Sequence, residues 1–293
     1  MATGNGLTLL DGGMGQELRK RSQQPASALW SAQVLLDEPH LVVAAHQAFV
    51  AAGADVITTS NYVATPQRLA RDGDPQWFDS LHKAALQAAH QGCAESDHPV
   101  RIAGCLPPLV ASYHADLVPD DATCQRDYAR LVEAQAHGVD LFIAETMSLT
   151  REAVAATRAA KQSGLPVWVA LTVDDHNGGQ LRSGESLAQA AQAVVDAGAH
   201  ALLINCSAPE AVTTAMPILA KLGVAYGGYA NGFEAAADLK AGGTVDTLKA
   251  RENLTPERYA EHVARWVATG ADLIGGCCEI GPAHIAELKR RFF

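Results

Sequence analysis

The sequence predicts an α/β protein: one domain, residues 1–293, in which eight parallel strands close into a (β/α)8 barrel, also called a TIM barrel. Two observations carry this prediction. Apolar, strand-like runs alternate with helical patterns along the chain, and four of these runs follow a repeated phrase in which a helical pattern ends at a glycine. The phrases are AGADVITTSNY, HGVDLFIAET, AGAHALLINCS and TGADLIGGCC. A doubly wound open sheet is the alternative fold.

The predicted elements alternate in chain order. Strands lie at 7–13, within 52–62, at 100–106, within 137–146, at 166–173, within 197–207, at 223–231 and within 269–278. Helical patterns lie at about 37–52, 76–93, 122–137, 150–162, 186–197, 209–222, 256–269 and 282–291. Several helices open with first-turn signals such as SAPE, LTPE and GPAH. Strands that are apolar almost throughout are typical of parallel sheets covered by helices, and eight such units favour the closed barrel.

The connections between these elements bear on domain count and on function. No Pro/Ser-rich linker or change in composition divides the chain, which supports a single domain. The segments 14–34 and 229–253 are long for strand-to-helix connections, and long loops in compact domains tend to be functional.

Composition narrows the class of function. The formal net charge is −10 and no run of Lys or Arg is long enough to make a basic patch, which disfavours nucleic acid or an anionic membrane as partner. The N-terminus has no signal-peptide pattern, and no stretch approaches the roughly 20 unbroken apolar residues of a membrane span. We therefore expect a cytoplasmic protein that acts on small molecules. Its six cysteines then indicate metal binding or catalysis rather than a disulfide framework.

Polar residues gather at the carboxyl ends of the predicted strands. In a barrel these ends share one face, and the loops that follow them build the active site. The strand-end residues are Asp11, Asn61, Tyr62, Glu145, Asn205, Cys206, Tyr229, Asn231, Cys277 and Cys278.

Three of these strand-end residues are thiols that can meet. Cys206 ends the sixth strand and the Cys277–Cys278 pair ends the eighth, and even-numbered strands share side-chain layers in a barrel. Neighbouring strand residues point to opposite faces, so joint use of the pair requires the backbone to leave β geometry, which Gly275 and Gly276 permit. Three thiolates suit a catalytic zinc that keeps its fourth position for substrate. The alternative is a strained vicinal disulfide.

The chain resembles the homocysteine S-methyltransferase family over nearly its whole length. The motifs that carry the resemblance are LLDGGMGQEL (9–18), LWSAQVLLDEPHLVVAAHQAFVAAGADVITTSNY (29–62), LPPLVASY (106–113), ETM (145–147), NCS (205–207), YANGF (229–233) and GGCCEIGPAHI (275–285). The resemblance implies a (β/α)8 barrel and zinc held by Cys206, Cys277 and Cys278. It also implies that homocysteine is the methyl acceptor. The family usually has a glycine after the cysteine pair, whereas this chain has Glu279.

The resemblance also implies roles in substrate binding. Asp11 and Glu145 would hold the amino group of homocysteine, and backbone amides near Gly12 and Gly13 would take its carboxylate. Zinc would bind the acceptor as a thiolate, which attacks the methyl group of a sulfonium or ammonium donor. S-methylmethionine is the expected donor, with S-adenosylmethionine as a second possibility.

Five further residues have less defined roles. Trp30, Tyr62 and Tyr229 are candidates for an aromatic box around a cationic donor. Asn205 and Asn231 are candidates for orienting the site or for filling a zinc position before substrate arrives. The alternatives in function are a selenohomocysteine, selenocysteine or other thiol methyltransferase of the same fold, a zinc-dependent hydrolase or lyase, and a zinc-binding or redox-sensing protein without catalysis. Asp11 and Glu145 argue against the last, because zinc storage has no use for an amino-acid pocket.

Overall fold

The computed structural model describes residues 6–23, 29–234, 239, 243 and 248–293. Its eight strands form one sheet in the order β1-β8-β7-β6-β5-β4-β3-β2, and every pairing is parallel. Leu10 continues β1 and bridges Val56 of β2 in parallel, which closes the sheet into a barrel. The strands are β1 Thr8–Leu9, β2 Val56–Thr58, β3 Arg101–Leu106, β4 Leu141–Met147, β5 Val167–Leu171, β6 Ala201–Asn205, β7 Ala225–Tyr229 and β8 Leu273–Ile274. The predicted barrel is confirmed, and the open sheet is excluded.

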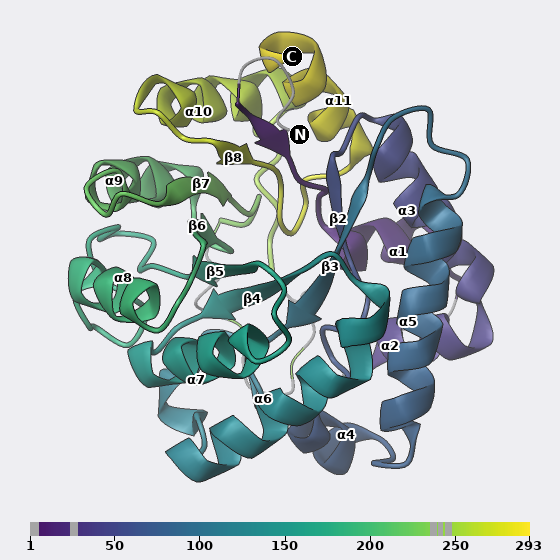
Figure 1. Cartoon of the computed structure of the whole chain (residues 1–293). Helices are drawn as coiled ribbons and strands as arrows, with labels where there is room; N and C mark the ends of the chain where they lie inside the picture. Colours follow the sequence, from purple (N-terminus) through teal and green to yellow (C-terminus); the bar gives the residue numbers. More distant parts are fainter. Residues whose placement is uncertain (1–5, 24–28, 235–238, 240–242, 244–247) are drawn as a thin grey trace.

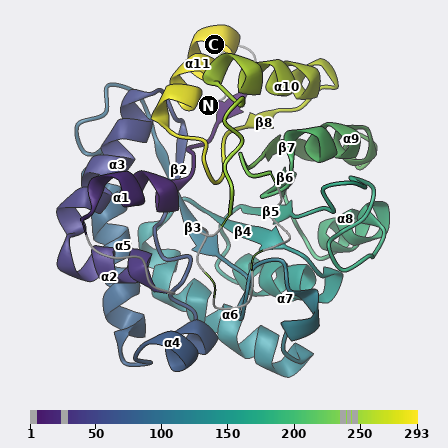
Figure 2. The same ribbon diagram turned by 180° about the vertical axis from the view of Figure 1, so that it is seen from behind.

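Helices ring the barrel on its outside (Figure 1), and the view from behind shows the same ring (Figure 2). Each of the eight predicted helices is present. The α-helices are α1 Met14–Arg21, α2 Trp30–Asp37, α3 Pro39–Ala51, α4 Pro66–Asp72, α5 Trp77–Cys93, α6 Asp121–Gln135, α7 Thr150–Lys161, α8 Leu187–Asp196, α9 Pro209–Leu219, α10 Pro256–Ala268 and α11 Pro282–Phe292. Two 3₁₀ turns, Ala115–Leu117 and Ala136–Gly138, complete the set in the described residues.

The segment 14–34, predicted as a long loop, is largely helical, so that prediction was wrong. It contains α1 and the start of α2. Helix α1 is eight residues long, and its N-cap residue Gly13 has no side chain to cap it. Such a short, highly charged helix forms through its packing on the barrel rather than through a local signal. The other long connection, 229–253, lies partly outside the described residues.

Two apolar layers hold the barrel together, one inside it and one between strands and helices. The outer layer is the larger and includes buried residues from the helices and the outward faces of the strands. The inner layer comprises Leu10, Val56, Ala103, Leu141, Ile143, Trp168, Ala170, Ala201, Leu203, Tyr229 and Leu273. Because both strand faces are buried, the strands are apolar in their middle, and polar side chains lie at their first residues, such as Arg101 of β3, or at their carboxyl ends.

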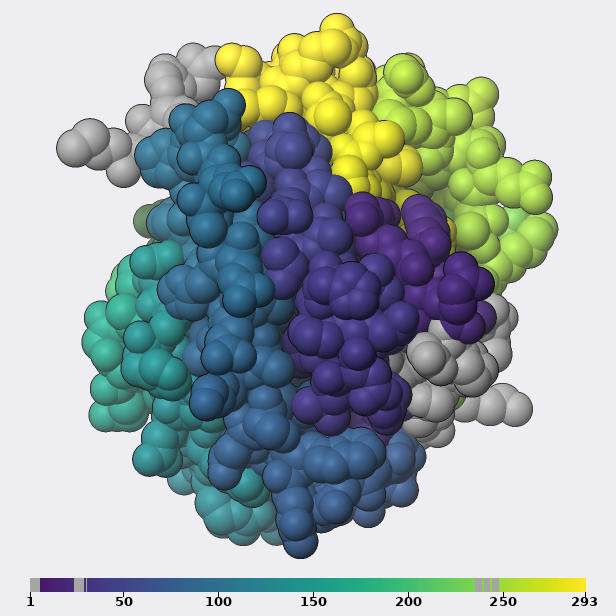
Figure 3. All heavy atoms as spheres, turned by 90° about the vertical axis from the view of Figure 1, so that its right-hand side faces the viewer, coloured from purple at the N-terminus to yellow at the C-terminus, as the bar shows by residue number. Residues whose placement is uncertain are grey.

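The two ends of the chain meet at the barrel seam. The N–H of Thr8 donates to the carbonyl of Asp272, and the N–H of Leu10 donates to that of Ile274. Figure 3 shows N-terminal helices (purple and blue) on the same face as the C-terminal helix α11 (yellow). This closure brings the loop after β1 beside the loop after β8. In the described residues, no helix has the length and apolar character needed to cross a membrane.

Candidate active site at the barrel mouth

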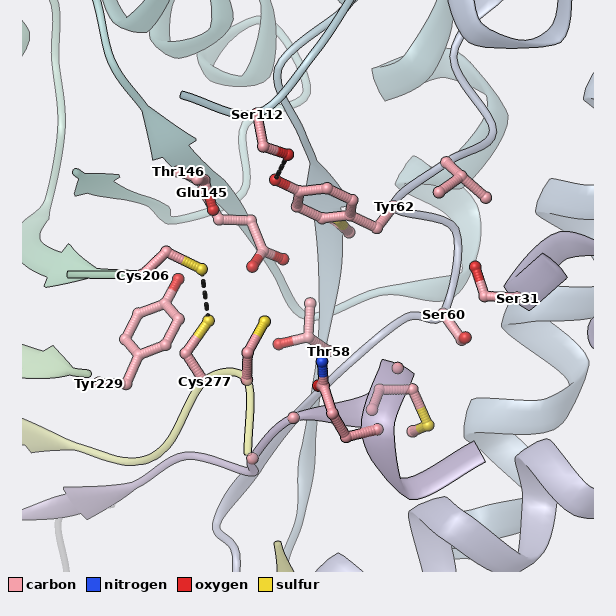
Figure 4. A pocket seen from close by; sticks show the side chains of 18 of the residues that line it. Ser31, Thr58, Ser60, Tyr62, Ser112, Glu145, Thr146, Cys206, Tyr229 and Cys277 are labelled. Carbon is pink, nitrogen blue, oxygen red and sulfur yellow. Dashed lines mark hydrogen bonds between the residues drawn. The ribbon is translucent and has the colours of Figure 1, made fainter. Parts of the chain in front are cut away.

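The three predicted thiols meet at the barrel mouth. Cys206 directly follows β6, while Cys277 and Cys278 lie in the loop after β8. The three sulfur atoms lie within 4.8 Å of one another, and the Sγ atoms of Cys206 and Cys277 are 2.6 Å apart. Figure 4 shows these two side chains pointing toward each other. All three cysteines are free thiols here, so the structure shows the cluster rather than the vicinal disulfide.

The backbone leaves β geometry after β8, as predicted. Gly276 donates its N–H to the carbonyl of Asp11 at 2.9 Å, and a Cβ at position 276 would lie only 2.2 Å from a side-chain carbon of Ile280. The Cys277 N–H then donates to the carbonyl of Ala230. A side chain at position 276 has no room, so glycine is required for the turn that presents both cysteines.

Left-handed backbone conformations concentrate around the thiols. Among the described non-glycine residues, four have positive φ: Tyr113 (68°), Thr146 (60°), Cys206 (48°) and Glu279 (66°). Three of them line the cavity and the fourth follows Cys278. Such conformations are disfavoured for L-residues and are maintained at functional sites by the surrounding structure. The positive φ of Glu279 also explains why a glycine suits that position.

The arrangement fits a tetrahedral metal with three sulfur ligands. Zinc–sulfur bonds of about 2.3 Å place two tetrahedral ligands about 3.8 Å apart, within the spread of these sulfurs. The hydrogen bonds from Cys277 and Cys278 hold the pKa of Cys206 well below its ordinary value, and the bond to Cys206 raises the pKa of Cys277. The free site thus favours one thiolate, at Cys206. A bound divalent cation would favour the thiolate form of all three cysteines.

Two carboxylates face the same cavity. Asp11 is 7% exposed, and its Oδ2 accepts the Thr58 N–H at 2.8 Å. Burial raises the pKa of Asp11 to about 8, with a smaller contribution from the charge of Glu145. Burial likewise raises the pKa of Glu145 to about 7, against the hydrogen bond from Cys105. In the described structure neither carboxylate has a cationic partner, so the pair favours a cationic ligand.

Gly12 and Gly13 bring the chain close to the cysteine loop. A Cβ at Gly12 would lie 2.1 Å from the carbonyl oxygen of Ile280, and one at Gly13 would lie 2.6 Å from that of Cys277. The N–H of Gly13 donates to the Ile280 carbonyl at 2.9 Å. This amide therefore holds the loop, and the next N–H groups along the chain are those that begin α1.

The two predicted asparagines are buried behind the cavity wall. Asn205 accepts the N–H of Thr146 and donates to its hydroxyl, both at 3.0 Å. Asn231 accepts the Phe233 N–H at 3.1 Å, and its Nδ2 has no partner. Neither residue lines the cavity. Asn205 holds the left-handed backbone at Thr146, beside Glu145.

The predicted aromatic residues differ in placement. Tyr62 and Tyr229 line the cavity. The Tyr62 hydroxyl lies 2.8 Å from that of Ser112, and the Arg68 guanidinium lies over the Tyr62 ring at 5.3 Å (Figure 4 shows the tyrosine–serine pair). One face of Tyr62 is therefore already used by a cation. Trp30 begins α2, and its side chain lies outside the described part of the structure.

Arg182 is a residue that the sequence did not single out. It lies between β5 and α8, and its Nη2 donates to both oxygens of Asp175 at 3.1 Å and to the Cys206 carbonyl at 3.0 Å. Its guanidinium lies 4.6 Å from the ring centroid of Tyr113, whose hydroxyl bonds to the Cys206 sulfur. Arg182 thus supports both the backbone of Cys206 and the partner of its thiol.

The cavity itself has a volume of about 210 Å³. Besides the cysteines and the two carboxylates, its lining includes residues to which the sequence gave no role: Gln16, Ser31, Ser60, Arg68, Ser112 and Tyr113. All of them except Arg68 lie within the family motifs quoted above. In Figure 4, Ser31 and Ser60 lie on the opposite side of the view from Cys206 and Tyr229. The cavity therefore offers thiols at one side and hydroxyl groups at the other.

Comparison with known proteins agrees with this site. The family model for homocysteine S-methyltransferase matches residues 8–292. Homocysteine S-methyltransferase of Escherichia coli (strain K12) is 30% identical over 97% of this chain and 95% of its own. Selenocysteine methyltransferase of Astragalus bisulcatus is 27% identical over 96% and 91%.

The metallated form of the E. coli homocysteine methyltransferase MmuM superposes with a TM-score of 0.82, at 27% identity over 98% of this chain and 97% of that one. The likeness thus extends over the whole barrel. The cysteine triad, the paired carboxylates and the match over residues 8–292 agree, and the chain belongs to the homocysteine S-methyltransferase family.

Proposed function

We propose that this protein is a zinc-dependent homocysteine S-methyltransferase that moves a methyl group from a small sulfonium donor to homocysteine and so forms methionine. One observation carries the proposal: three clustered thiols and two carboxylates without cationic partners line one cavity. The thiols suit a soft metal that activates a sulfur nucleophile, and the carboxylates suit the ammonium group of an amino acid.

The metal role rests on the chemistry of Cys206, Cys277 and Cys278. Three sulfur ligands within 4.8 Å of one another, with no histidine among them, fit zinc better than harder cations. When bound, zinc would supply the acceptor sulfur as a thiolate at neutral pH. The E. coli relative has a metallated form, which supports metal binding by this protein.

Asp11 and Glu145 would bind the amino group of the acceptor. With pKa values raised to about 8 and about 7, they are partly neutral at pH 7 in the free protein. An ammonium group placed between them would favour their ionised forms, because an opposite charge stabilises a buried carboxylate. This contact fixes the α-carbon of the acceptor, and its side chain then extends toward the thiols.

The transfer itself needs alignment more than proton chemistry. The acceptor thiolate forms a bond to the methyl carbon, the bond from that carbon to the donor sulfur breaks, and its electron pair stays on the donor as a neutral thioether. The thiol proton would be released to solvent when the acceptor binds as a thiolate, so no general base is needed. Tyr229, Thr146 and Tyr62 would exclude water and hold the two substrates in line.

The donor would carry a carboxylate that Arg68 can bind. Arg68 lines the cavity, is 8% exposed, and donates from Nε and Nη2 to the Pro108 carbonyl at 3.3 and 3.1 Å. No described carboxylate lies within ion-pair distance of it, and a buried charge without a counter-ion is unfavourable. S-methylmethionine combines a sulfonium methyl with a carboxylate, and S-adenosylmethionine is the second candidate.

Selenium acceptors are a second candidate function. The Astragalus bisulcatus relative is named a selenocysteine methyltransferase, at 27% identity over 96% of this chain. The selenolate of such an acceptor would bind at the same place as the thiolate of homocysteine, beside the three cysteines. Competition between homocysteine and selenocysteine for one donor distinguishes the two, because the preferred acceptor has the higher kcat/KM.

The test uses zinc-loaded protein, homocysteine and four donors: S-methylmethionine, S-adenosylmethionine, betaine and dimethylsulfoniopropionate. Methionine formation with a sulfonium donor is expected. Cys277→Ala is expected to lose both bound zinc and turnover, whereas the matched control Cys93→Ala, in helix α5 and outside the cavity, keeps both. Failure to form methionine from any donor, or a Cys277→Ala variant with full activity, would refute the proposal.

A further inference from the structure

Cys105 is a buried thiol of the cavity wall that has no part in the reaction described above. It lies in β3, it is 1% exposed, and it lines the cavity. Its strand partner in β4 is Ile143, and Glu145 lies two residues further along β4 in the same cavity wall. Ala103 and Ile143 belong to the inner apolar layer, and alternate residues of a strand share a face, so Cys105 also points into the barrel. Its thiol therefore lies beside Glu145, one side-chain layer deeper.

Buried side chains hold the backbone of Cys105 in place. Strand β2 ends at Thr58, so side chains continue its pairing with β3. The Cys105 N–H donates to the Thr59 hydroxyl at 3.0 Å. Its carbonyl accepts from the side-chain amides of Asn61 at 3.2 Å and Gln135 at 3.1 Å. These three partners are themselves buried, so the Cβ of Cys105 is fixed and only a change of χ1 rotamer could move its sulfur.

The two carboxylates of the cavity have different anchors. Asp11 accepts the backbone N–H of Thr58 at 2.8 Å. Among the described residues, no N–H or O–H group donates to Glu145, and the hydrogen bond that it accepts comes from the Cys105 thiol. Burial, together with the charge and the hydrogen bond of Glu145, holds the pKa of Cys105 well above its ordinary value, so the thiol keeps the proton that it donates. An uncharged donor of this kind orients a carboxylate and leaves its negative charge available for a cation.

We propose that Cys105 is a positioning residue for acceptor binding: its thiol donates to the Glu145 carboxylate and holds it toward the place where the ammonium group of the acceptor binds. Cys105 thus serves Glu145 as the Thr58 N–H serves Asp11. The inference rests on the proposed function and deepens it, because it adds a residue on which recognition of an amino-acid acceptor depends.

The first test compares Cys105→Ala with Cys105→Ser, two variants that differ by one hydroxyl group. In Cys105→Ala the KM for homocysteine is expected to rise about tenfold, as for the loss of a weak donor to a charged group, while kcat and the donor KM stay unchanged. In Cys105→Ser the KM should stay within about twofold of wild type, because an O–H donor replaces the thiol. The control is Cys124→Ala, which removes another thiol that is 1% exposed, in α6 and outside the cavity lining; it should lower the melting temperature and leave the KM unchanged.

The second test measures binding without donor or turnover. L-methionine should raise the melting temperature of wild type and Cys105→Ser more than that of Cys105→Ala. With 4-(methylsulfanyl)butanoate, which is methionine without its amino group, all three proteins should show equal thermal shifts. An unchanged KM in Cys105→Ala, an equal rise in both variants, or equal thermal shifts with L-methionine would overturn the inference. Those results would leave the proposed function intact, whereas its own failure appears as absent methionine formation in wild type.

Discussion

Replacement of Asp11 by asparagine is expected to stabilise the free protein while it removes activity. Burial raises the pKa of Asp11 from 3.8 to about 8. At pH 7, about 3 pH units above the ordinary pKa of 3.8, the residue is ionised in the unfolded chain but mostly neutral in the fold. At about 1.4 kcal/mol per unit, Asp11 therefore destabilises the fold by about 4 kcal/mol at pH 7. Asparagine has no charge to desolvate and so avoids this destabilisation, and its oxygen can still accept the Thr58 N–H.

The pH dependence follows from the direction of the shift. Below about pH 4 the carboxyl is neutral in both states, so the two proteins should be equally stable. Between about pH 4 and pH 8 only the unfolded state is ionised, so the advantage of Asp11→Asn should grow. Above about pH 8 both states are ionised and the difference should become constant.

The assay is urea unfolding at pH 5, 6, 7 and 8, without substrate, together with kcat/KM for homocysteine. The matched control is Asp116→Asn, whose carboxylate is 75% exposed and should show no such pH-dependent gain. Activity of Asp11→Asn should fall at least 100-fold, because an ammonium group loses its counter-ion. A variant that is no more stable than wild type, or a gain that does not grow with pH, would refute the reasoning.

Three further predictions follow from the same geometry. The KM for homocysteine should fall as pH rises from about 6 to 8, because Glu145 and Asp11, with pKa values of about 7 and about 8, must ionise to hold the ammonium group; a flat profile would contradict this. Arg68→Gln should raise the donor KM about tenfold or more and leave the acceptor KM unchanged in steady-state assays; equal effects on both would argue against donor binding. Arg182→Leu should destabilise the fold by about 3 kcal/mol, measured by urea unfolding, since Asp175 loses its cationic partner. It should also weaken zinc retention in chelator competition, since the Cys206 carbonyl keeps only the Thr172 hydroxyl of its two side-chain donors. Unchanged zinc affinity would limit Arg182 to a stabilising role.

The barrel and its thiols could be predicted from sequence because their signals are local. A strand that is buried on both faces is apolar along its length. A polar residue after an apolar run, such as Asp11, Glu145 or Cys206, therefore indicates that the strand is ending. The two glycines before Cys277 likewise indicate that the backbone leaves β geometry there. These signals need no knowledge of distant neighbours.

Contacts between distant segments were decided only by the tertiary structure. Helices α1 and α2 replace a predicted loop, because packing on the barrel stabilises helices too short to form alone. Arg182 supports Cys206 from another connection, and the Gly13 amide, predicted to lie near a substrate carboxylate, binds Ile280. Whether a buried polar side chain has a hydrogen-bond or ion-pair partner depends on every element around it. The sequence by itself thus determined which residues end the strands and which chemistry they carry. Only the closed barrel decided which polar groups remain free for a ligand, because pairing is a property of neighbours in space rather than along the chain.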